Sequence, residues 1–535
     1  MNIPIINSLL SYLQGDGAVI LPEIELLLFG LGILLIDFWI TEKEKYLNAG
    51  LALAGTLFSG FTLWRLRGAI AARGEFAGFH DSALVDPFFL FFAVLFLAAT
   101  ALVILLSVKY LEIEREQEGE YYALLLFACI GMMFMASGID LIVMFLGLET
   151  MALSFYVLTG FLRREKRSNE AALKYVLLGA FSSGILAYGF SILYGLSDAT
   201  NIVKITETLG FRENLTHAVA LSHLAGPQGE PARQILTRQL PIALNFDPLT
   251  LQLLPILAFV LVAVGLFFKV AAVPFHQWAP DVYEGAPTPI TAYVSVASKT
   301  ASFALLLRLF TTVFAPSHRM WIYLIAGVAV ASLTWGNLAA LTQTNVKRLL
   351  AYSSISHVGY ILLGLLAWNE STGKLTRNAS TGIAFYLLSY VFMTAGAFAV
   401  LIVLRQKGII GEELDDLNGL YYRSPAAAVL LLIFMLSLAG IPPTAGFMGK
   451  YFIFLSLIET HHPLLAVFAV LYIVPALYYY FRIVVHAWLK QPGEAPAPIM
   501  TSAQAVALGI AVFVTLAAGL YPEPFTRLAQ YAFGQ

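Results

Sequence analysis

The chain is a succession of apolar runs separated by short polar segments. A transmembrane helix needs about 20 predominantly apolar residues. About fourteen runs reach that length, at residues 21–40, 47–66, 87–108, 121–138, 140–162, 171–196, 249–273, 288–310, 320–341, 348–368, 380–404, 425–442 (continuing to about 458), 463–488 and 502–521. The pattern predicts an all-α polytopic membrane protein of about 14 transmembrane helices, with residues 1–535 forming a single transmembrane domain.

The polar segments mark helix starts and one long loop. Asp86-Pro87 and Asp247-Pro248 each place an N-cap acceptor before a first-turn proline. The longest interruption, at about 198–247, is polar in patches and is expected to be an extramembrane loop rather than a second domain.

Short-loop lysines and arginines predict the orientation in the membrane. Loops after odd-numbered helices carry about twice as many of these residues as the other short loops and the termini, and Arg163, Arg164 and Lys166 belong to them. We therefore expect cytoplasmic odd-numbered loops and both termini on the non-cytoplasmic side. Residues 1–20 lack a basic n-region, so no cleavable signal peptide is expected.

Composition supports the membrane class and excludes others. Hydrophobic residues make up 59% and charged residues only 12%, too few to cover a water-facing surface. The net charge of −2 argues against a nucleic-acid partner. Cys129 is the only cysteine and cannot hold an iron–sulfur cluster alone. With no metal-ligand spacing or phosphate-binding loop in the sequence, this chain is not expected to bind NADH, flavin or a metal.

Five ionisable residues lie inside apolar runs, where each costs at least about 2.5–3.5 kcal/mol to insert. They are Glu149, Lys269, Lys299, His357 and Lys450. Burial disfavours a charged ammonium, whereas a nearby carboxylate favours it, so such a lysine can exchange protons as its partner approaches and withdraws. The set predicts a proton relay. The alternatives are a protonated structural glutamate, lysines that snorkel to the surface, and a hydrogen-bonded structural histidine.

Two of the predicted helices are broken by prolines. The prolines interrupt the helical backbone hydrogen bonds in two segments, VPFHQWAPDVYEGAPTP and GIPPTAGF. Such an interruption is tolerated at membrane depth only beside a cavity or inside protein. We expect the first segment to be a loop from about Trp278 onward. Lys450 follows the second break, so we expect it near a restarted helix N-terminus, where the helix dipole disfavours a cation.

The breaks and the ionisable residues form a weak internal repeat. A first repeat, 121–310, holds Glu149 and then Lys269 at a break, and a second, 320–488, holds His357 and then Lys450 at a break. Because each contains five predicted crossings, the sequence predicts two inverted five-helix repeats.

Four segments resemble a known family. FFKVAAVPFHQWAPDVYEGAPTPITAYVSVASK, ALKYVLLGAFSSGILAYGFSILYG, TQTNVKRLLAYSSISHVGY and LSLAGIPPTAGFMGKYFIF are similar to segments of the antiporter-like proton-channel subunits of NADH-quinone oxidoreductase (complex I). The VYEGAPTP version resembles the N type of subunit. The sister M type usually has a glutamate at the position of Lys450, which argues against that type.

The resemblance implies roles for individual residues. Glu149 resembles the carboxylate that pairs with the lysine at the position of Lys269. Lys299 resembles the central linking lysine, His357 the histidine of the connecting path, and Lys450 the terminal lysine on the exit side. Lys174, in ALKY, also matches a family position, although near a helix end snorkelling explains it equally well.

The function implied is proton translocation coupled to electron transfer from NADH to quinone, both bound elsewhere in the complex. FMN and iron–sulfur clusters are then implied in other subunits, and the implied partners are the antiporter-like subunit M and small membrane subunits such as K. The implied location is the bacterial inner membrane. Two rivals stay open: a subunit of an Mrp-type Na⁺/H⁺ antiporter, and a scaffold whose buried charges only fix helix packing.

Overall fold

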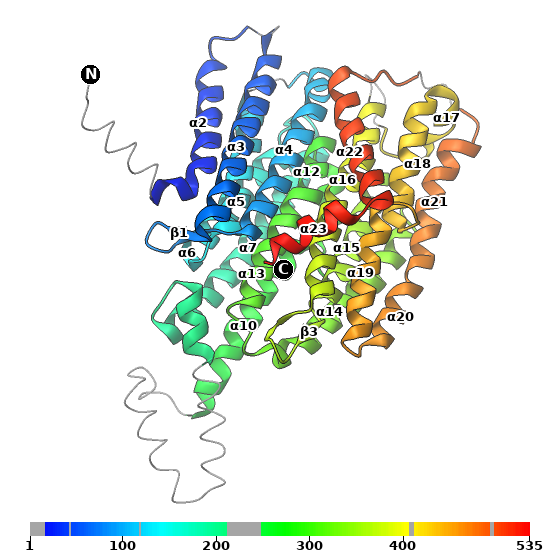
Figure 1. Cartoon of the computed structure of the whole chain (residues 1–535). Coiled ribbons are helices and arrows are strands. Elements are labelled where there is room, and N and C mark those ends of the chain that lie inside the picture. Colours follow the sequence, from blue (N-terminus) through cyan, green and yellow to red (C-terminus); the bar gives the residue numbers. More distant parts are fainter. Residues whose placement is uncertain are drawn as a thin grey trace, which may run out of the picture.

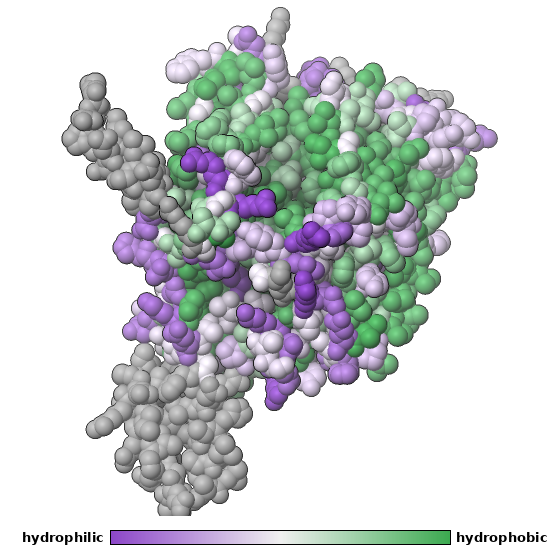
Figure 2. Space-filling view, viewed as in Figure 1, coloured by the Kyte–Doolittle hydropathy of each residue, from purple (hydrophilic) through white to green (hydrophobic). Residues whose placement is uncertain are grey.

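The computed structural model describes residues 16–41, 44–116, 119–210, 248–405, 411–492 and 497–534. Helices run side by side through most of the molecule, and the face seen in Figure 2 is largely hydrophobic, as a lipid-contacting surface requires. Within the described residues, twelve helices are long and apolar enough to cross a membrane. The protein is therefore an all-α polytopic membrane protein.

The N-terminal part consists of η1 (Asp16–Ile20), α2 (Leu21–Ile36), α3 (Tyr46–Arg73), β1 (Phe76–Gly78), β2 (Ala83–Val85) and α4 (Pro87–Glu114). The next group is α5 (Gly119–Ser137), α6 (Leu141–Thr159), α7 (Lys166–Ser197), α10 (Pro248–Val270), α11 (Trp278–Gly285), α12 (Thr288–Tyr293), the π-helical turn η5 (Val294–Ser298) and α13 (Lys299–Thr311). The third group is α14 (His318–Ala340), α15 (Val346–Gly364), β3 (Trp368–Asn369), β4 (Lys374–Leu375), α16 (Arg377–Leu404), η6 (Leu414–Leu417), α17 (Leu420–Arg423), α18 (Pro425–Ala439), α19 (Ala445–Glu459), α20 (Pro463–Leu471) and α21 (Ile473–Leu489). The chain continues with α22 (Ser502–Leu520) and α23 (Glu523–Ala532).

Each predicted apolar run contains helix, and the departures have local causes. The run at 348–368 is α15, which carries Lys347, Arg348 and His357 and is less apolar than its neighbours. The run at 425–458 is the broken pair α18 and α19. The two antiparallel hairpins β1–β2 and β3–β4, and α23, which lies across the bundle in Figure 1, were not predicted. The predicted loop lies outside the described residues from 211 to 247, whereas 202–210 is helical.

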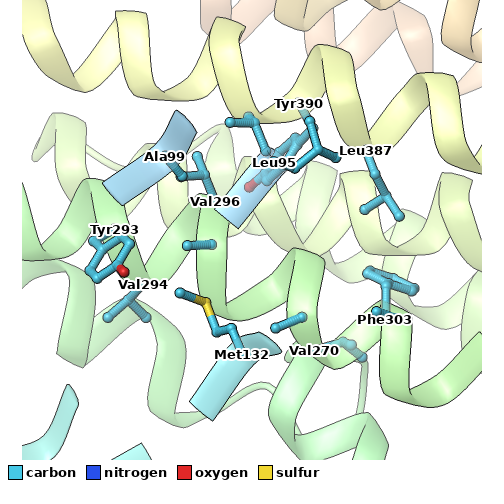
Figure 3. Close-up of a cluster of buried hydrophobic side chains, with 14 of the residues drawn as sticks. Leu95, Ala99, Met132, Val270, Tyr293, Val294, Val296, Phe303, Leu387 and Tyr390 are labelled. Carbon is cyan, nitrogen blue, oxygen red and sulfur yellow. The ribbon is translucent and has the colours of Figure 1, made fainter. Parts of the chain in front are cut away.

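The core lies where α4, α5, α10, η5, α13 and α16 meet (Figure 3). Leu95, Met132 and Val296 are fully or almost fully buried there, beside Tyr293. The Tyr293 hydroxyl lies 2.7 Å from the hydroxyl of Thr100 and donates to the carbonyl oxygen of Leu125 at 3.1 Å. The polar end of this tyrosine is thus satisfied inside an apolar core.

A buried ion pair joins α4 to α13. Asp86 caps α4 as predicted, accepting a 2.7 Å hydrogen bond from the backbone N–H of Phe89. The same carboxylate receives two hydrogen bonds from Arg308, at 2.9 and 3.0 Å, and Arg308 also donates to the carbonyl oxygen of Ala136. The capping residue therefore also anchors α4 to the core, in the bidentate geometry that suits arginine.

Two helix pairs pack at backbone contact. A Cβ added to Gly131 of α5 would lie 2.6 Å from the carbonyl oxygen of Gly147 in α6. A Cβ added to Gly336 of α14 would lie 2.6 Å from the backbone nitrogen of Ser356 in α15. These pairs open the two predicted repeats, and in both the absence of a side chain permits the close approach.

The two helix breaks lie where the prolines predicted them. α10 ends at Val270 and α18 ends at Ala439. The expectation of a loop from Trp278 onward is wrong, because Trp278–Gly285 forms the short helix α11. Pro280 falls in its first turns, where proline is tolerated, and the Trp278 ring stacks on Tyr175 of α7 at 4.8 Å.

Candidate functional site

Four cationic or potentially cationic side chains are almost completely enclosed by the bundle. The exposed fractions are 5% for Lys269, 2% for Lys299, 3% for His357 and 2% for Lys450. Snorkelling is therefore not how this structure accommodates the three lysines. Each needs a local partner, because an isolated buried charge is very costly.

Glu149 of α6 and Lys269 of α10 lie at one end of this row. They interact electrostatically but form no salt bridge, and Glu149 Oε1 is buried without a hydrogen-bond partner among the described residues. Tyr156 lies beside both, with its ring 5.9 Å from Lys269 Nζ. A Cβ at Gly179 would lie 2.0 Å from the Tyr156 hydroxyl, so this glycine leaves the space that the tyrosine occupies. Glu149 and Lys269 thus place an acid and a base within electrostatic range of each other, with no ion pair between them among the described residues.

Lys299 begins α13 directly after the π-helical turn η5. Such single turns are frequently found at functional sites because they alter the direction of the side chains that follow. Lys299 Nζ donates to the hydroxyl of Ser354 on α15 and lies 5.7 Å from the centre of the Tyr283 ring. Its hydrogen-bond partner is thus neutral, so the ammonium is stabilised by dipoles and an aromatic face.

His357 lies one turn after Ser354 on α15 and has a tyrosine hydroxyl on each ring nitrogen. Nδ1 is 2.6 Å from the Tyr386 hydroxyl and Nε2 is 3.1 Å from that of Tyr480. The Tyr480 hydroxyl also bonds Ser353. Since hydroxyls both donate and accept, either imidazole tautomer fits without moving a heavy atom.

Lys450 lies in the second turn of α19, and its ammonium reaches the end of α18. Nζ donates to the carbonyl oxygens of Leu438 at 3.2 Å and Ala439 at 2.8 Å. The expectation that a helix N-terminus disfavours this cation is therefore wrong. Helical side chains point towards their own N-terminus, so Lys450 crosses the break and meets the C-terminal carbonyls of the preceding helix, which favour a positive charge.

Lys299, His357 and Lys450 belong to one connected group. Tyr386, bonded to His357, stacks on Tyr360, and the Tyr360 ring lies 4.8 Å from Lys450 Nζ. His357 is also within electrostatic range of both lysines. Between Lys269 and Lys299 lie mainly aromatic rings, including Tyr156, Tyr175 and Trp278, so the first pair is not hydrogen-bonded directly to this group. The structure thus brings the predicted residues into two neighbouring clusters.

Lys174 lies apart from both clusters and is 43% exposed. It donates to Asp281 of α11 at 2.9 Å and pairs with Glu170, while Arg348 of α15 bonds both Asp281 and Glu284. Burial raises the pKa of Asp281, but hydrogen bonds from Lys174 and Arg348 outweigh it, and the net pKa lies below the usual value. This cluster ties α11 to α7 and α15 and is a structural clamp.

Several site residues were not found in the sequence. Tyr283, Tyr386 and Tyr480 look like ordinary aromatic residues of apolar runs, although a buried tyrosine hydroxyl usually needs a partner. Lys347 is buried too and donates to Glu412 at 2.9 Å and to the carbonyl oxygen of Ala286 beside the first helix break. The proximity of Pro287 to VKRLL in space has no signal in a single sequence.

Fold and site together define a polytopic membrane protein with a buried row of ionisable groups, the arrangement that ion translocation requires. The comparisons with known proteins agree with this class. The family model "NADH:quinone oxidoreductase/Mrp antiporter, TM" matches residues 137–475. The chain belongs to this family.

Relatives and solved structures extend the match to nearly the whole chain. NADH-quinone oxidoreductase subunit N 2 of Solibacter usitatus is 50% identical over 97% of this chain and 98% of its own length. Subunit N 1 of Koribacter versatilis is 49% identical over 97% and 96%. A chain of respiratory complex I from Thermus thermophilus, solved with bound aureothin, has a TM-score of 0.73 and 30% identity, covering 95% of this chain and all of that one. A chain of the Mrp complex from Dietzia shares the fold, with a TM-score of 0.75 and 20% identity over 95% and 96%.

Proposed function

We propose that Glu149, Lys269, Lys299, His357 and Lys450 form the proton relay of this protein. The protein is a proton-translocating membrane subunit of NADH-quinone oxidoreductase, a multi-pass protein of the bacterial inner membrane that works within a multisubunit complex. Electron transfer from NADH to quinone takes place in other subunits, and this one moves protons. Lys174 acts outside the relay, as part of the Asp281 clamp.

The observation that carries the relay is the buried cluster from Lys299 to Lys450. Hydrogen bonds join Lys299 to Ser354 and His357 to Tyr386, whereas the link from Tyr386 through Tyr360 to Lys450 consists of ring contacts. Ser354, His357, Tyr386 and Tyr360 lie between the two lysines, and the first three offer hydroxyl or imidazole groups that pass protons in either direction. Glu149 and Lys269 supply an acid and a base that interact electrostatically, and Glu149 Oε1 is buried without a hydrogen-bond partner among the described residues. Movement at either helix break would change the distances within these groups.

The decisive experiment is NADH-driven proton pumping by inverted membrane vesicles containing the whole complex. A Lys269→Ala/Lys299→Ala double variant should assemble but pump poorly, and because pumping is coupled to redox chemistry, quinone reduction should slow as well. Lys109→Ala, which removes an exposed lysine paired with Glu112, is the matched control. Normal pumping by the assembled double variant would support the scaffold reading instead.

The Mrp-type alternative rests on the shared fold and is less well supported. Its solved relative is 20% identical, against 50% for a subunit N relative. Vesicles that exchange Na⁺ for H⁺ without NADH would favour it. Co-purification of flavin and iron–sulfur signals with this chain in mild detergent would favour the complex, where FMN and the clusters belong to other subunits.

Three finer assignments belong to the same proposal. The neighbouring partners are the antiporter-like subunit M and small membrane subunits such as K. Both termini face the non-cytoplasmic side, which accessibility labelling of added cysteines would test. Residues 121–310 and 320–488 are inverted repeats, supported by the matching close-packed pairs α5–α6 and α14–α15 and by a lysine at each break.

A further inference from the structure

A groove of about 670 Å³ opens on the membrane-facing side of the molecule, between α3, α4, α16, α22 and α23. Most of its wall is apolar and includes Leu95, Phe392 and Val514. Figure 2 shows a hydrophobic hollow in this face, above α23, with hydrophilic residues at its lower edge. None of the relay residues line it, so the groove is separate from the site described above.

Two arginines and two interface-type aromatics line the same groove. Arg67 of α3 is exposed and has no ion-pair or hydrogen-bond partner among the described residues. Within the part of the chain that the structure describes, Arg527 of α23 is bonded only to the exposed Glu523 one turn earlier, at 2.5 Å. Trp64 and Tyr531 line the groove together with the two arginines, and these four residues form its charged part. The lining contains no Asp or Glu. The groove therefore presents an unneutralised positive charge beside an apolar channel.

The charged part of the groove lies towards a membrane surface and the apolar part extends inward. α3 ends at Arg73, shortly after Arg67, while α16 begins at Arg377, whose side chain bonds Gln530 of α23. From that start, Leu388 lies eleven residues along α16, a rise of about 16 Å. This is close to half the roughly 30 Å thickness of a bilayer core. Phe392, the other lining residue of α16, lies fifteen residues along, a rise of about 22 Å. The groove thus extends from near one membrane surface to around the middle of the bilayer core.

From this geometry we propose that the groove binds an anionic phospholipid. The phosphate is bound by the Arg67 and Arg527 guanidinium groups, and an acyl chain lies against the apolar walls of α4, α16 and α22. Arginine binds phosphate oxygens through paired N–H donors, and Trp64 and Tyr531 suit the headgroup level. A helix of a neighbouring subunit is the other candidate occupant, but an apolar helix would leave Arg67 uncompensated, since only Arg527 has a carboxylate partner among the described residues.

The test uses the intact complex, partly delipidated in mild detergent and then incubated with phosphatidylglycerol or phosphatidylcholine. Native mass spectrometry counts the lipids that this subunit retains after it is released from the complex. An Arg67→Gln/Arg527→Gln double variant should lose about tenfold or more in phosphatidylglycerol retention, with little change for phosphatidylcholine. Arg65→Gln, on the same helix but outside the groove lining, should bind like the parent. The parent should bind free inorganic phosphate much more weakly than the lipid.

A second variant tests the apolar part without touching the charges. Val94 lines the groove and is half-exposed, so Val94→Trp fills the channel with little risk to folding. It should also reduce phosphatidylglycerol retention. Unchanged retention in either variant would overturn the proposal. So would a photo-crosslinker at position 94 that joins a neighbouring subunit rather than lipid in native membranes.

Discussion

The ammonium of Lys450 lies 2.8 Å from the carbonyl oxygen of Ala439, the last residue of the preceding helix. The lysine therefore holds its proton through carbonyls that belong to the other side of a helix break. A change in the α18–α19 angle would alter this bond directly, because the donor and the acceptor lie on different helices. In the relay proposed above, the break is therefore a point where helix movement would act on Lys450.

The first prediction concerns replacement of Lys450. Lys450→Arg keeps the positive charge near the α18 carbonyls but cannot release its proton, because arginine stays protonated in proteins. Both Lys450→Arg and Lys450→Ala should assemble, and both should lower NADH-driven acidification by about a hundredfold or more, the scale of a lost proton-transfer group. The measurement is dye-reported acidification of inverted vesicles, normalised to complex content. If Lys450→Arg pumps like the parent, Lys450 is a fixed charge.

The second prediction concerns Glu149. Glu149→Gln removes the carboxylate that acts electrostatically on Lys269 and should impair pumping and quinone reduction together, by about a hundredfold or more. Glu149→Asp keeps the carboxylate on a shorter side chain and should retain part of the activity. Parallel measurement of proton pumping and NADH oxidation distinguishes a coupling defect from an assembly defect. A Glu149→Gln complex with full pumping would contradict the role of the pair.

The third prediction separates hydrogen bonding from packing around His357. Tyr386 bonds Nδ1, whereas Tyr390 packs against the imidazole ring at 5.3 Å and neither ring nitrogen of His357 bonds its hydroxyl. Tyr386→Phe should slow pumping several-fold, as expected for the loss of a hydrogen bond worth about 1 kcal/mol. Tyr390→Phe should pump like the parent. Equal defects in the two variants would show that ring packing matters rather than the hydroxyl.

The fourth prediction concerns the pH dependence of the Asp281 clamp. A carboxyl whose pKa is lowered in the folded state stabilises the fold above its unfolded pKa of about 3.9, and that stabilisation is lost as the pH falls through the folded pKa. Asp281→Asn should therefore lower the midpoint of thermal unfolding at pH 7 and at pH 5, and the difference from the parent should shrink below about pH 4. Thermal scans of the purified complex would measure it. A difference in unfolding midpoint that grows towards low pH would contradict the lowered pKa of Asp281.

The fifth prediction assigns Arg423 to structure alone. Its guanidinium donates to the carbonyl oxygens of Asp416 at 2.7 Å and Asn418 at 3.2 Å, closing the turn before α18. Arg423→Ala should reduce stability by about 1 kcal/mol and leave pumping per assembled complex unchanged. Expression-matched vesicles provide the comparison. A strong pumping defect in fully assembled complex would place this loop in the mechanism.

The sequence was sufficient to predict features that depend on the length of an apolar run or on the depth of a residue in the membrane. Apolar runs located the helices because a bilayer admits little else, and the places of Lys299 and His357 inside such runs agree with their burial in the structure. The tyrosines were missed because Tyr386 and Tyr480 lie 29 and 123 residues from His357 along the chain. Lys450 was misread because position on a helix was taken for the position of the ammonium, and a long side chain separates the two. α11 was missed because its stability comes from contacts with Tyr175 and Arg348, which are distant in sequence.

The Asp86–Arg308 pair constrains the order in which the chain can be built into the membrane. Its two halves are 222 residues apart, so α4 must be synthesised long before its arginine exists. Asp86 can be inserted without Arg308, since it lies at a helix start and already accepts a hydrogen bond from the N–H of Phe89. Arg308 needs its counter-charge at insertion, because it enters as a cation on a helix that is enclosed in the finished protein. The early helix thus supplies the counter-charge for Arg308 before Arg308 is synthesised.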